Sequence, residues 1–336
     1  MSEPSTSVLI AGTRPRALAR CLESLAVQTV PPGEVLVAWQ GDDTPTRDTT
    51  VETAARLRLP VRAVHAPERG VVPAENAALD AAGGEIVLLI DDDAVAPRDW
   101  LARHLAHYRD PRVGAVGGPF TNYHPDGAPY VKRPAEPVGA LSWCGKPHGN
   151  MNDHPPAWRG RPAAEVHHLA GGNMSLRRAA FGRFEARLRR YWQFFEMDAC
   201  LQVRARGYRV LFDFANVIDH HPTSATFAAG RDGDLAVKVF HPAYNHAFVL
   251  GKHLAGWRRA ACLAYLLGVG SVGAPGLLGS LAAAWRYGRP WRELGILRRT
   301  LRARVEGWRD GSRERACRGE ATRAPECVQP AGAPTT

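Results

Sequence analysis

Residues 85–94 read Glu-Ile-Val-Leu-Leu-Ile-Asp-Asp-Asp-Ala, so that five apolar residues in a row end in three adjacent carboxylates. The apolar run, Ile86 to Ile90, is rich in β-branched residues and predicts a strand that is buried on both faces. Three neighbouring carboxylates repel one another. Their position after a buried strand therefore indicates a cation, most simply a divalent metal held by oxygen ligands. The plainer alternative is a solvated acidic turn before a helix.

Strand and helix patterns alternate in the chain that leads up to this stretch. The expected strands are 7–11, 34–39, 61–65 and 86–90, and the helical patterns between them lie around 18–25, at 47–58 and at 73–82. Short connections join these segments. This order predicts an α/β fold with a mostly parallel central sheet and helices on both of its faces.

Polar loops follow three of these strands, at Thr13-Arg14, at Gln40–Asp43 and at Asp91–Asp93. Ligands of an open α/β sheet bind at the carboxyl ends of its strands, so these loops are expected to form one nucleotide pocket. The chain has neither a glycine-rich dinucleotide loop nor a Walker-type loop, which disfavours both of those phosphate sites. The phosphates of a nucleotide would instead be held by the metal.

Residues 121–164 are dense in Pro, Gly, His and Asn and are too long for an ordinary connection. They are interpreted as a loop over a site, with Trp143 and Trp158 available to stack on a sugar or a lipid. A variable surface insertion is an equally good interpretation.

A glycine pair, Gly171-Gly172, would let the backbone approach a substrate closely. Asn173 and Ser175 after it offer hydrogen-bond partners for hydroxyl groups, and a helix is expected to run on to Phe181. Further helical and strand patterns at 196–206, 210–214 and 216–218 lead to His220-His221.

Seven motifs in this order resemble those of a family 2 glycosyltransferase with a GT-A fold, over about residues 7–222. They are the first strand with Thr13-Arg14, Gln40-Gly-Asp-Asp43, Arg69-Gly70 with Asn76, Ile90-Asp-Asp-Asp93, Gly171-Gly-Asn-Met-Ser175, Phe195-Glu-Met-Asp198 with Arg206-Gly-Tyr208, and Val217-Ile-Asp-His-His221. Each motif alone is weak, whereas all seven in the right order are specific.

The resemblance implies a site for Mg²⁺ or Mn²⁺. Asp91 and Asp93 look like the D-x-D pair, and Asp92 between them is an alternative ligand. His220, in slight preference to His221, resembles the histidine that completes the metal or phosphate site in many members. The ion would neutralise the charge that develops on the leaving nucleoside diphosphate.

The resemblance also implies a set of donor contacts. Gln40, Asp42 and Asp43 look like the loop that contacts a pyrimidine. The other expected contacts to the donor are Thr13, Arg14, Arg69, Asn76, Asp91, Asp92, Gly172 and Asn173. One departure is visible, because Glu75-Asn76 stands where members often have Arg-Asn. A contact to the donor phosphates is therefore missing or made elsewhere.

The catalytic base of the family is an acidic residue at the start of the helix that follows the glycine pair. Glu196 is aligned with that position, and Asp198 is the alternative. The base would deprotonate an acceptor hydroxyl, which attacks the anomeric carbon from the face opposite the leaving group, so that the configuration is inverted.

Charge and cysteine content disfavour two classes of protein, nucleic-acid binders and zinc-binding proteins. The net charge of the 336 residues is +10, yet residues 252–323 hold 15 basic and 5 acidic residues, so the rest is nearly neutral. A nucleic-acid binder is not expected from such a distribution. The six cysteines are scattered without a C-x-x-C pair, which disfavours a zinc site. No signal segment opens the chain, and a cytoplasmic protein is expected.

The expected organisation is a disordered start at 1–6, a GT-A catalytic domain at 7–225, a helical region at 226–309 and a disordered tail at 310–336. Within the helical region, 260–285 has no charged residue. Its glycines and Pro275 favour two short helices, either packed on the domain or dipping into a bilayer. A basic amphipathic helix at 290–309 fits an anionic membrane surface, or else an ordinary solvated face.

These observations predict an inverting, metal-dependent glycosyltransferase at or near the inner face of the cell membrane. It would use a UDP- or dTDP-sugar and a hydroxyl acceptor on a glycan, a lipid-linked saccharide or a small molecule, as in bacterial surface polysaccharide synthesis. The alternatives are a nucleotidyltransferase and a catalytically inactive protein that binds sugar nucleotides or acts as a membrane scaffold.

Overall fold

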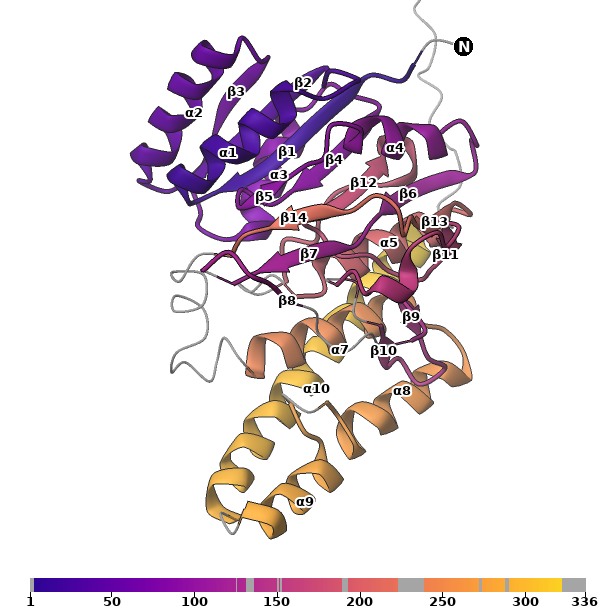
Figure 1. The fold of residues 1–336 in the computed structure, drawn as a ribbon. Helices are drawn as coiled ribbons and strands as arrows, with labels where there is room; N and C mark the ends of the chain where they lie inside the picture. The colour runs from indigo at the N-terminus through magenta and orange to yellow at the C-terminus, as the bar shows by residue number, and fades with distance from the viewer. Residues whose placement is uncertain are drawn as a thin grey trace, which may run out of the picture.

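A mixed eight-stranded sheet forms the centre of the molecule in the computed structural model (Figure 1). The strand order is β11-β13-β6-β12-β4-β1-β2-β3. The structure describes residues 3–124, 126–130, 136–149, 151, 153–188, 193–222, 239–271, 274–287 and 290–321. The α/β architecture with a large central sheet that the sequence predicts is the one observed.

The first half of the sheet follows the alternation expected from the sequence. Its strands are β1 (Thr6–Gly12), β2 (Glu34–Gln40), β3 (Val61–Ala66) and β4 (Ile86–Ile90), and neighbouring strands pair in parallel. The helices between them are α1 (Pro15–Ala26), α2 (Thr44–Leu57) and α3 (Val71–Ala81). All five residues of β4 are buried, because helices cover both faces of the sheet.

The second half of the sheet mixes strand directions. It contains β6 (Val113–Gly117), β11 (Ala164–Glu165), β12 (Asn173–Arg177) and β13 (Arg209–Phe212). β12 runs antiparallel between β4 and β6, and β13 runs parallel to β6. The helix expected to run to Phe181 is a single short 3-10 helix, η2 (Arg178–Ala180), directly after β12.

A smaller sheet places a histidine beside the acidic end of β4. It has the order β5-β14-β7-β8, from β5 (Ala94–Val95), β14 (Ile218–His220), β7 (Phe120–Tyr123) and β8 (Pro129–Tyr130). Helix α4 (Trp100–His107) lies between β5 and β6 in the chain. His220 pairs with Ala94, the residue directly after Asp93. The pairing thus brings the histidine to the acidic loop from some 130 positions further along the chain.

The insertion at 121–164 is packed against the domain where the structure describes it. Its short strands β9 (Ala140–Leu141) and β10 (Pro147–His148) form a hairpin. Trp158 is only 1% exposed and packs edge-on against Phe212 and Phe214. Trp158 is therefore a core residue and cannot stack on a ligand, in contrast to the expectation. Trp143 is exposed and lies against Trp257.

The C-terminal region is a helical extension that projects from the sheet domain (Figure 1). It consists of α7 (His241–His253), α8 (Trp257–Gly268), α9 (Leu277–Tyr287) and α10 (Pro290–Ala321), and it follows α5 (Phe195–Ala205) of the domain. The uncharged segment 260–285 thus forms two short helices, as expected. Among the described residues, no helix combines the length and the apolar character that a membrane crossing requires.

Both expected disordered ends need correction. Helix α10 continues to Ala321, so residues 310–321 are ordered. Its Gly307 and Gly311 let the helix lie against the backbone of α7, where a Cβ atom would come within 2.3 Å of the Tyr244 carbonyl oxygen and 2.1 Å of that of Phe248. At the N-terminus, Thr6 already belongs to β1. Residues 1–2, 322–336 and the expected boundary at 225/226 lie outside the described residues.

Candidate active site

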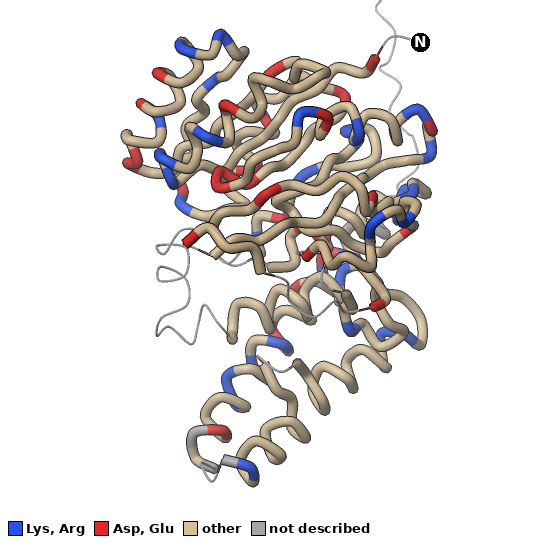
Figure 2. The backbone as a smooth tube through the Cα atoms, in the orientation of Figure 1, with Lys and Arg blue, Asp and Glu red and all other residues tan. Residues whose placement is uncertain are grey.

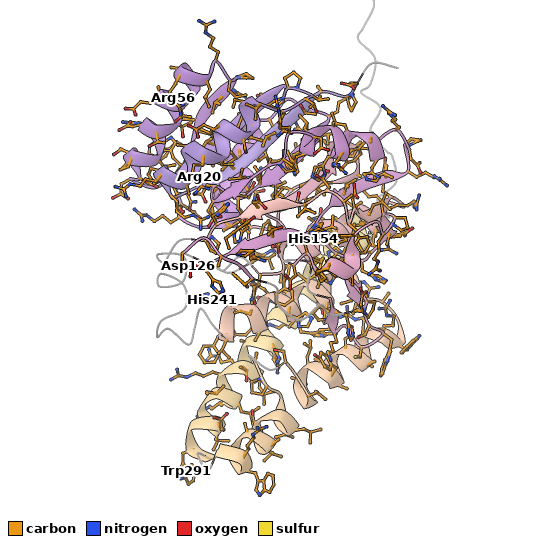
Figure 3. All side chains as sticks on the ribbon, viewed as in Figure 1. Arg20, Arg56, Asp126, His154, His241 and Trp291 are labelled. Carbon is orange, nitrogen blue, oxygen red and sulfur yellow. The ribbon has the colours of Figure 1, made fainter. Side chains whose placement is uncertain are left out.

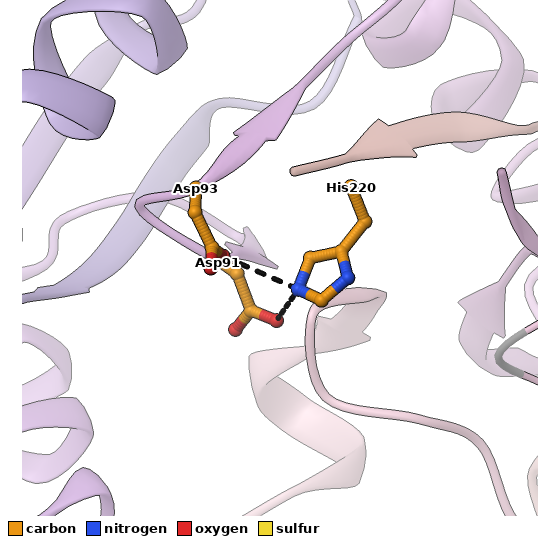
Figure 4. Close-up of side chains that lie close together, drawn as sticks. All are labelled: Asp91, Asp93 and His220. Atoms are coloured by element: carbon orange, nitrogen blue, oxygen red, sulfur yellow. Dashed lines mark ion pairs between the residues drawn. The ribbon is translucent and has the colours of Figure 1, made fainter. Parts of the chain in front are cut away.

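Asp91, Asp93 and His220 come together at the carboxyl end of β4 (Figure 4). One ligand atom from each lies within 4.8 Å of the other two. His220 Nε2 is 3.3 Å from Asp93 Oδ1 and 3.8 Å from Asp91 Oδ2. The backbone amide of His221 donates a hydrogen bond to the Asp93 carbonyl oxygen, which fixes β14 beside the acidic loop.

The chemistry of these three residues fits a divalent cation. The Asp93 side chain is buried, and neither of its oxygens has a well-directed hydrogen-bond donor among the described residues, although Arg14 Nη1 lies 2.8 Å away. His220 Nδ1 is 3.0 Å from Asn122 Oδ1, so Nδ1 carries the proton and Nε2 faces the carboxylates. A histidine oriented in this way by a second residue is typical of metal ligands.

Asp92 has a different role from its two neighbours. It is fully buried and accepts hydrogen bonds from the amides of Thr13 and Arg14, at 2.7 and 2.9 Å, and from Arg14 Nε at 2.7 Å. It therefore fixes the turn between β1 and α1 and orients the guanidinium of Arg14 toward Asp93. The expected contact of Asp92 with the donor, or with the metal, is wrong because its oxygens are already used.

A pocket of about 520 Å³ opens beside this cluster, at the ends of β1 and β2. It is lined by Thr13, Gln40, Asp42, Asp43, Pro45 and Arg69. Gln40 Oε1 accepts a hydrogen bond from the amide of Gly70. Asp43 caps α2 by accepting a hydrogen bond from the amide of Thr46, and it accepts another from the Thr46 hydroxyl. Arg69 pairs with Asp42 at the rim. The structure thus brings the expected base-binding residues together around one cavity.

The glycine pair separates Asp91 from Glu196. A Cβ atom on Gly172 would lie 2.3 Å from Asp91 Oδ2, and one on Gly171 would lie 2.9 Å from Glu196 Cγ. A larger residue at either position would displace one of the two carboxylates. The close approach expected from the glycines is therefore an approach to the acidic side chains of the protein itself.

Glu196 lies in the first turn of α5, after Phe194, whose φ of 77° is unusual for a residue with a side chain. Burial raises the pKa of Glu196 to about 8, and the charge of Asp91 adds to the rise. Hydrogen bonds from the backbone of Gly171 and Phe194 lower the pKa but do not offset the effect of burial. A carboxyl group with a pKa close to neutral pH is suited to accept a proton from a substrate.

Asp198, the alternative base, is a structural residue. It is fully buried and contacts Lys252 Nζ at 2.7 Å, His253 Nε2 at 2.8 Å and Gln202 Nε2 at 2.8 Å. Burial alone would raise its pKa, but the hydrogen bond and charge of His253, followed by Lys252, hold the pKa well below its usual range. A carboxylate so strongly paired is a poor base, so Asp198 is corrected to an anchor for α7.

Two expected donor contacts are internal cross-links instead. Asn76 exchanges two hydrogen bonds with the backbone of Phe184, at 2.9 and 3.1 Å. Asn173 accepts from Trp100 Nε1 and donates to the carbonyl oxygens of Pro119 and Asn216. Both amides are buried and hold segments of the chain together, and Asn173 uses both of its N–H groups within the protein.

Glu75 belongs to the site but was not among the expected site residues. It is 5% exposed, and its Oε2 has no hydrogen-bond partner among the described residues. Burial first, then the charges of Asp91 and Glu196, raise its pKa to about 8. The departure from Arg-Asn in the sequence was the available signal. That departure leaves a carboxyl group, whose pKa responds to Asp91 and Glu196, where many members have a guanidinium group.

Comparison with solved structures shows the same fold at low identity. The mannosyltransferase PcManGT from Pyrobaculum calidifontis, in complex with GDP-Man and Mn²⁺, matches with a TM-score of 0.55 and 19% identity, over 94% of this chain and 85% of that one. S. aureus TarS 1-349, in complex with UDP, matches with a TM-score of 0.53 and 14% identity, over 94% and 92%. GalNAc-T7 with UDP, GalNAc and Mn²⁺ matches with a TM-score of 0.55 and 14% identity, over 75% and 48%.

Comparison of sequences identifies a relative and a family. The succinoglycan biosynthesis protein ExoM of Rhizobium meliloti (strain 1021) is 34% identical over 117 residues, which are 33% of this chain and 37% of that protein. The chain thus matches little more than a third of that relative. The family model "Glycosyl transferase family 2" matches residues 8–184, which run from β1 to the segment after β12. The match covers more than half of the 336 residues of this chain, and the chain therefore belongs to glycosyl transferase family 2.

Proposed function

We propose that the protein is an inverting glycosyltransferase that requires Mg²⁺ or Mn²⁺ and moves a sugar from a nucleoside diphosphate sugar to a hydroxyl acceptor. The observation that carries the proposal is the cluster of Asp91, Asp93 and His220 next to the pocket lined by Gln40 and Arg69. Two adjacent sites of this kind suit a ligand with a base at one end and a diphosphate at the other. Membership of the family supports the same reaction.

Glu196 is assigned as the general base. Its carboxylate accepts the proton of the acceptor hydroxyl while the hydroxyl oxygen forms a bond to the anomeric carbon. The bond from that carbon to the diphosphate oxygen breaks on the opposite face, and its electron pair leaves with the nucleoside diphosphate. The charge on the leaving group would be neutralised by a cation held by Asp91, Asp93 and His220, which is what such an ion supplies in these reactions.

The donor is proposed to be a UDP- or dTDP-sugar, and the acceptor a glycan, a lipid-linked saccharide or a small molecule. UDP in the TarS and GalNAc-T7 complexes supports a pyrimidine nucleotide as the donor. A GDP-sugar is the alternative donor, because PcManGT binds GDP-Man. The name of ExoM supports a role in bacterial cell-surface polysaccharide synthesis.

A donor screen tests the reaction. The purified protein is expected to release nucleoside diphosphate from one member of a panel of UDP-, dTDP- and GDP-sugars when Mn²⁺ or Mg²⁺ is present, and EDTA is expected to stop the release. Asp93→Asn should lower the rate by on the order of 10²-fold or more, because it weakens both the metal site and the stabilisation of the leaving group. Asp48→Asn, which changes an exposed carboxylate, should have no effect. Release that persists in EDTA, or undiminished in Asp93→Asn, would contradict the proposal.

The same proposal places the enzyme on the anionic cytoplasmic face of the cell membrane. Six large apolar residues of α9 and of the start of α10 are between 48% and 90% exposed: Leu277, Leu278, Leu281, Trp285, Trp291 and Leu294. This end of the helical extension points away from the sheet, with Trp291 at its tip (Figures 1 and 3). Basic residues also lie along α9 and α10 (Figure 2). Three of them, Arg286, Arg298 and Arg302, are exposed. Apolar residues beside basic ones suit an anionic lipid surface.

Sedimentation with lipid vesicles tests this placement. The protein is expected to bind vesicles that contain phosphatidylserine or phosphatidylglycerol, and to bind phosphatidylcholine vesicles much less. The double variant Trp285→Ser/Trp291→Ser should lose most of this binding, since each side chain is more than four-fifths exposed and removing it costs the fold little. Equal binding by the variant, or no preference for anionic lipid, would count against a membrane surface.

A further inference from the structure

Glu75 is an acidic residue in the site that the proposed mechanism leaves without a role. It lies in the middle of α3 and is 95% buried, with one carboxyl oxygen lacking a hydrogen-bond partner among the described residues. Buried polar atoms without a partner are rare in folded proteins, and each needs an explanation. A ligand that supplies the missing partner is one such explanation.

The other buried acids of this region show what a structural carboxylate looks like here. Asp92 accepts several hydrogen bonds from the turn of Thr13 and Arg14, and Asp198 is surrounded by Lys252, His253 and Gln202. Each of them joins two segments of the chain. Glu75 differs from both of them, because its Oε2 has no such contact among the described residues.

The position of Glu75 is defined by the groups that act on it. The next residue, Asn76, is bonded to Phe184, whose ring packs against Phe195, the residue directly before Glu196. The charges of Asp91 and Glu196 both act on the Glu75 carboxyl group, so this group lies near these two side chains. In the proposed reaction, Asp91 lies on the diphosphate side of the donor and Glu196 on the acceptor side. The sugar that is transferred has to lie between them.

Two other roles suit Glu75 less well. A carboxyl group carries no positive charge to attract the donor diphosphate, so it cannot replace the arginine that often occupies this position in the family. Glu75 is also not part of the cluster of possible metal ligands in the described part of the chain, which consists of Asp91, Asp93 and His220. A neutral hydroxyl group of the donor sugar, which can both donate and accept, is the ligand that fits.

We propose that Glu75 is a specificity-determining residue that binds the transferred sugar through a hydrogen bond between its carboxyl group and a sugar hydroxyl. The inference rests on the proposed function and goes one step further, because it assigns sugar recognition to a position at which this chain departs from its family. Sites that hydrogen-bond a substrate hydroxyl discriminate strongly, since the buried protein group is left unpaired by the wrong ligand.

Calorimetric titration of two variants tests the inference in the presence of Mn²⁺. Glu75→Met keeps the length of the side chain without polar atoms, and Glu75→Gln keeps a donor and an acceptor. Each variant is titrated with UDP, GDP, UDP-glucose, UDP-galactose, UDP-N-acetylglucosamine and GDP-mannose. Asp80→Asn, an exposed carboxylate of the same helix, is the control.

Glu75→Met is expected to bind the preferred sugar nucleotide about tenfold or more weakly than the wild type, yet to bind the free nucleoside diphosphate equally well. Its thermal midpoint should be unchanged or higher, because a buried oxygen without a partner has been removed. Glu75→Gln should recover most of the sugar-nucleotide affinity.

Three results would overturn the inference, and only the third of them would also overturn the proposed function. Unchanged affinity for the sugar nucleotide in Glu75→Met would remove the role of Glu75 and leave the proposed function intact. Equal weakening for sugar nucleotide and nucleoside diphosphate, with a lower thermal midpoint, would make Glu75 a structural residue. No binding of any of the six nucleotides to the wild type would remove the proposed function, and the inference with it.

Discussion

Glu196→Gln is expected to lower kcat by about 10²- to 10⁴-fold, the range lost when a general base is removed. Glutamine has nearly the same shape, so contacts of the side chain with the backbone of Gly171 and Phe194 are largely kept. It cannot accept the proton of the acceptor hydroxyl. Binding of the nucleoside diphosphate should therefore be unchanged, and calorimetry with Mn²⁺ and UDP checks this separately from turnover.

The pH dependence of the same reaction has a predicted sign. Only the ionised carboxylate accepts a proton, so the wild-type rate should rise with pH through the pKa of Glu196. Burial raises that pKa to about 8, and a cation bound next to Asp91 would lower it again. Glu196→Gln should lose this rise, while Glu52→Gln, an exposed carboxylate of α2, should keep it. A wild-type profile that is flat from pH 6 to 9, or a Gln variant with full activity, would assign the base elsewhere.

The elements that build the site could be predicted from the sequence because each depends on a short stretch of chain. For β1, β2 and β4 alike, the buried strand and the polar residues that follow it lie within about ten residues of one another in the sequence. The rule that ligands meet at the ends of parallel strands then assembles them without coordinates. The proximity of Asp91 and Asp93, and the pocket around Gln40, are consequences of this local information. The place of His220 beside them was implied only by the resemblance to the family.

The polar residues that turned out to be structural could not be recognised in this way. Asn76 is bonded to Phe184, Asn173 to Trp100 and Asp198 to Lys252, at separations of 54 to 108 residues. A buried amide that is satisfied within the protein and one that is reserved for a ligand have the same appearance in a sequence. Only the hydrogen-bond partners distinguish them, and these are brought together by the tertiary fold.

The helical structure of segment 310–321 could not be predicted from its local sequence either. Its composition is polar and charged, which favours disorder when the segment is considered alone. In the structure it is held by contacts with distant residues, since Tyr244 donates to Asp310 at 2.9 Å and Arg187 pairs with Glu314. The small residues Gly307 and Gly311 allow this close approach. No local pattern in the sequence distinguishes such glycines from helix-breaking ones.

Lys252→Met is expected to lower the free energy of unfolding by about 3–5 kcal/mol, the range for breaking a buried ion pair from one side. The Lys252 side chain is 1% exposed, and its Nζ lies 2.7 Å from Asp198 and 3.0 Å from Glu185. Methionine would fill the space of the aliphatic stem but would leave both carboxylates with one cation fewer. Urea unfolding, followed by circular dichroism, measures the change.

Two further variants separate the buried charge from other effects of the substitution. Arg302→Met breaks an exposed ion pair with Glu306 in the same helical extension and should cost less than about 1 kcal/mol. Lys252→Met/Asp198→Leu removes both charges of the buried pair and should recover part of the lost stability, because an apolar pair can replace a buried ion pair. If the single and double variants were equally destabilised, the loss would come from packing rather than from the unpaired carboxylate.

The position of this ion pair also predicts an effect on activity. Asp198 is two residues from Glu196 on α5, and the turn before that helix is supported by α7, where His246 stacks on Phe194 and Asn245 donates to the Gln193 carbonyl oxygen. Helix α7 therefore holds the base in place as well as the C-terminal extension. Lys252→Met should lower kcat even at temperatures where the variant is folded, because a base displaced by about 1 Å loses on the order of 10²-fold in rate. A folded variant with full kcat would show that α5 keeps Glu196 in position without α7, and that the ion pair serves stability alone.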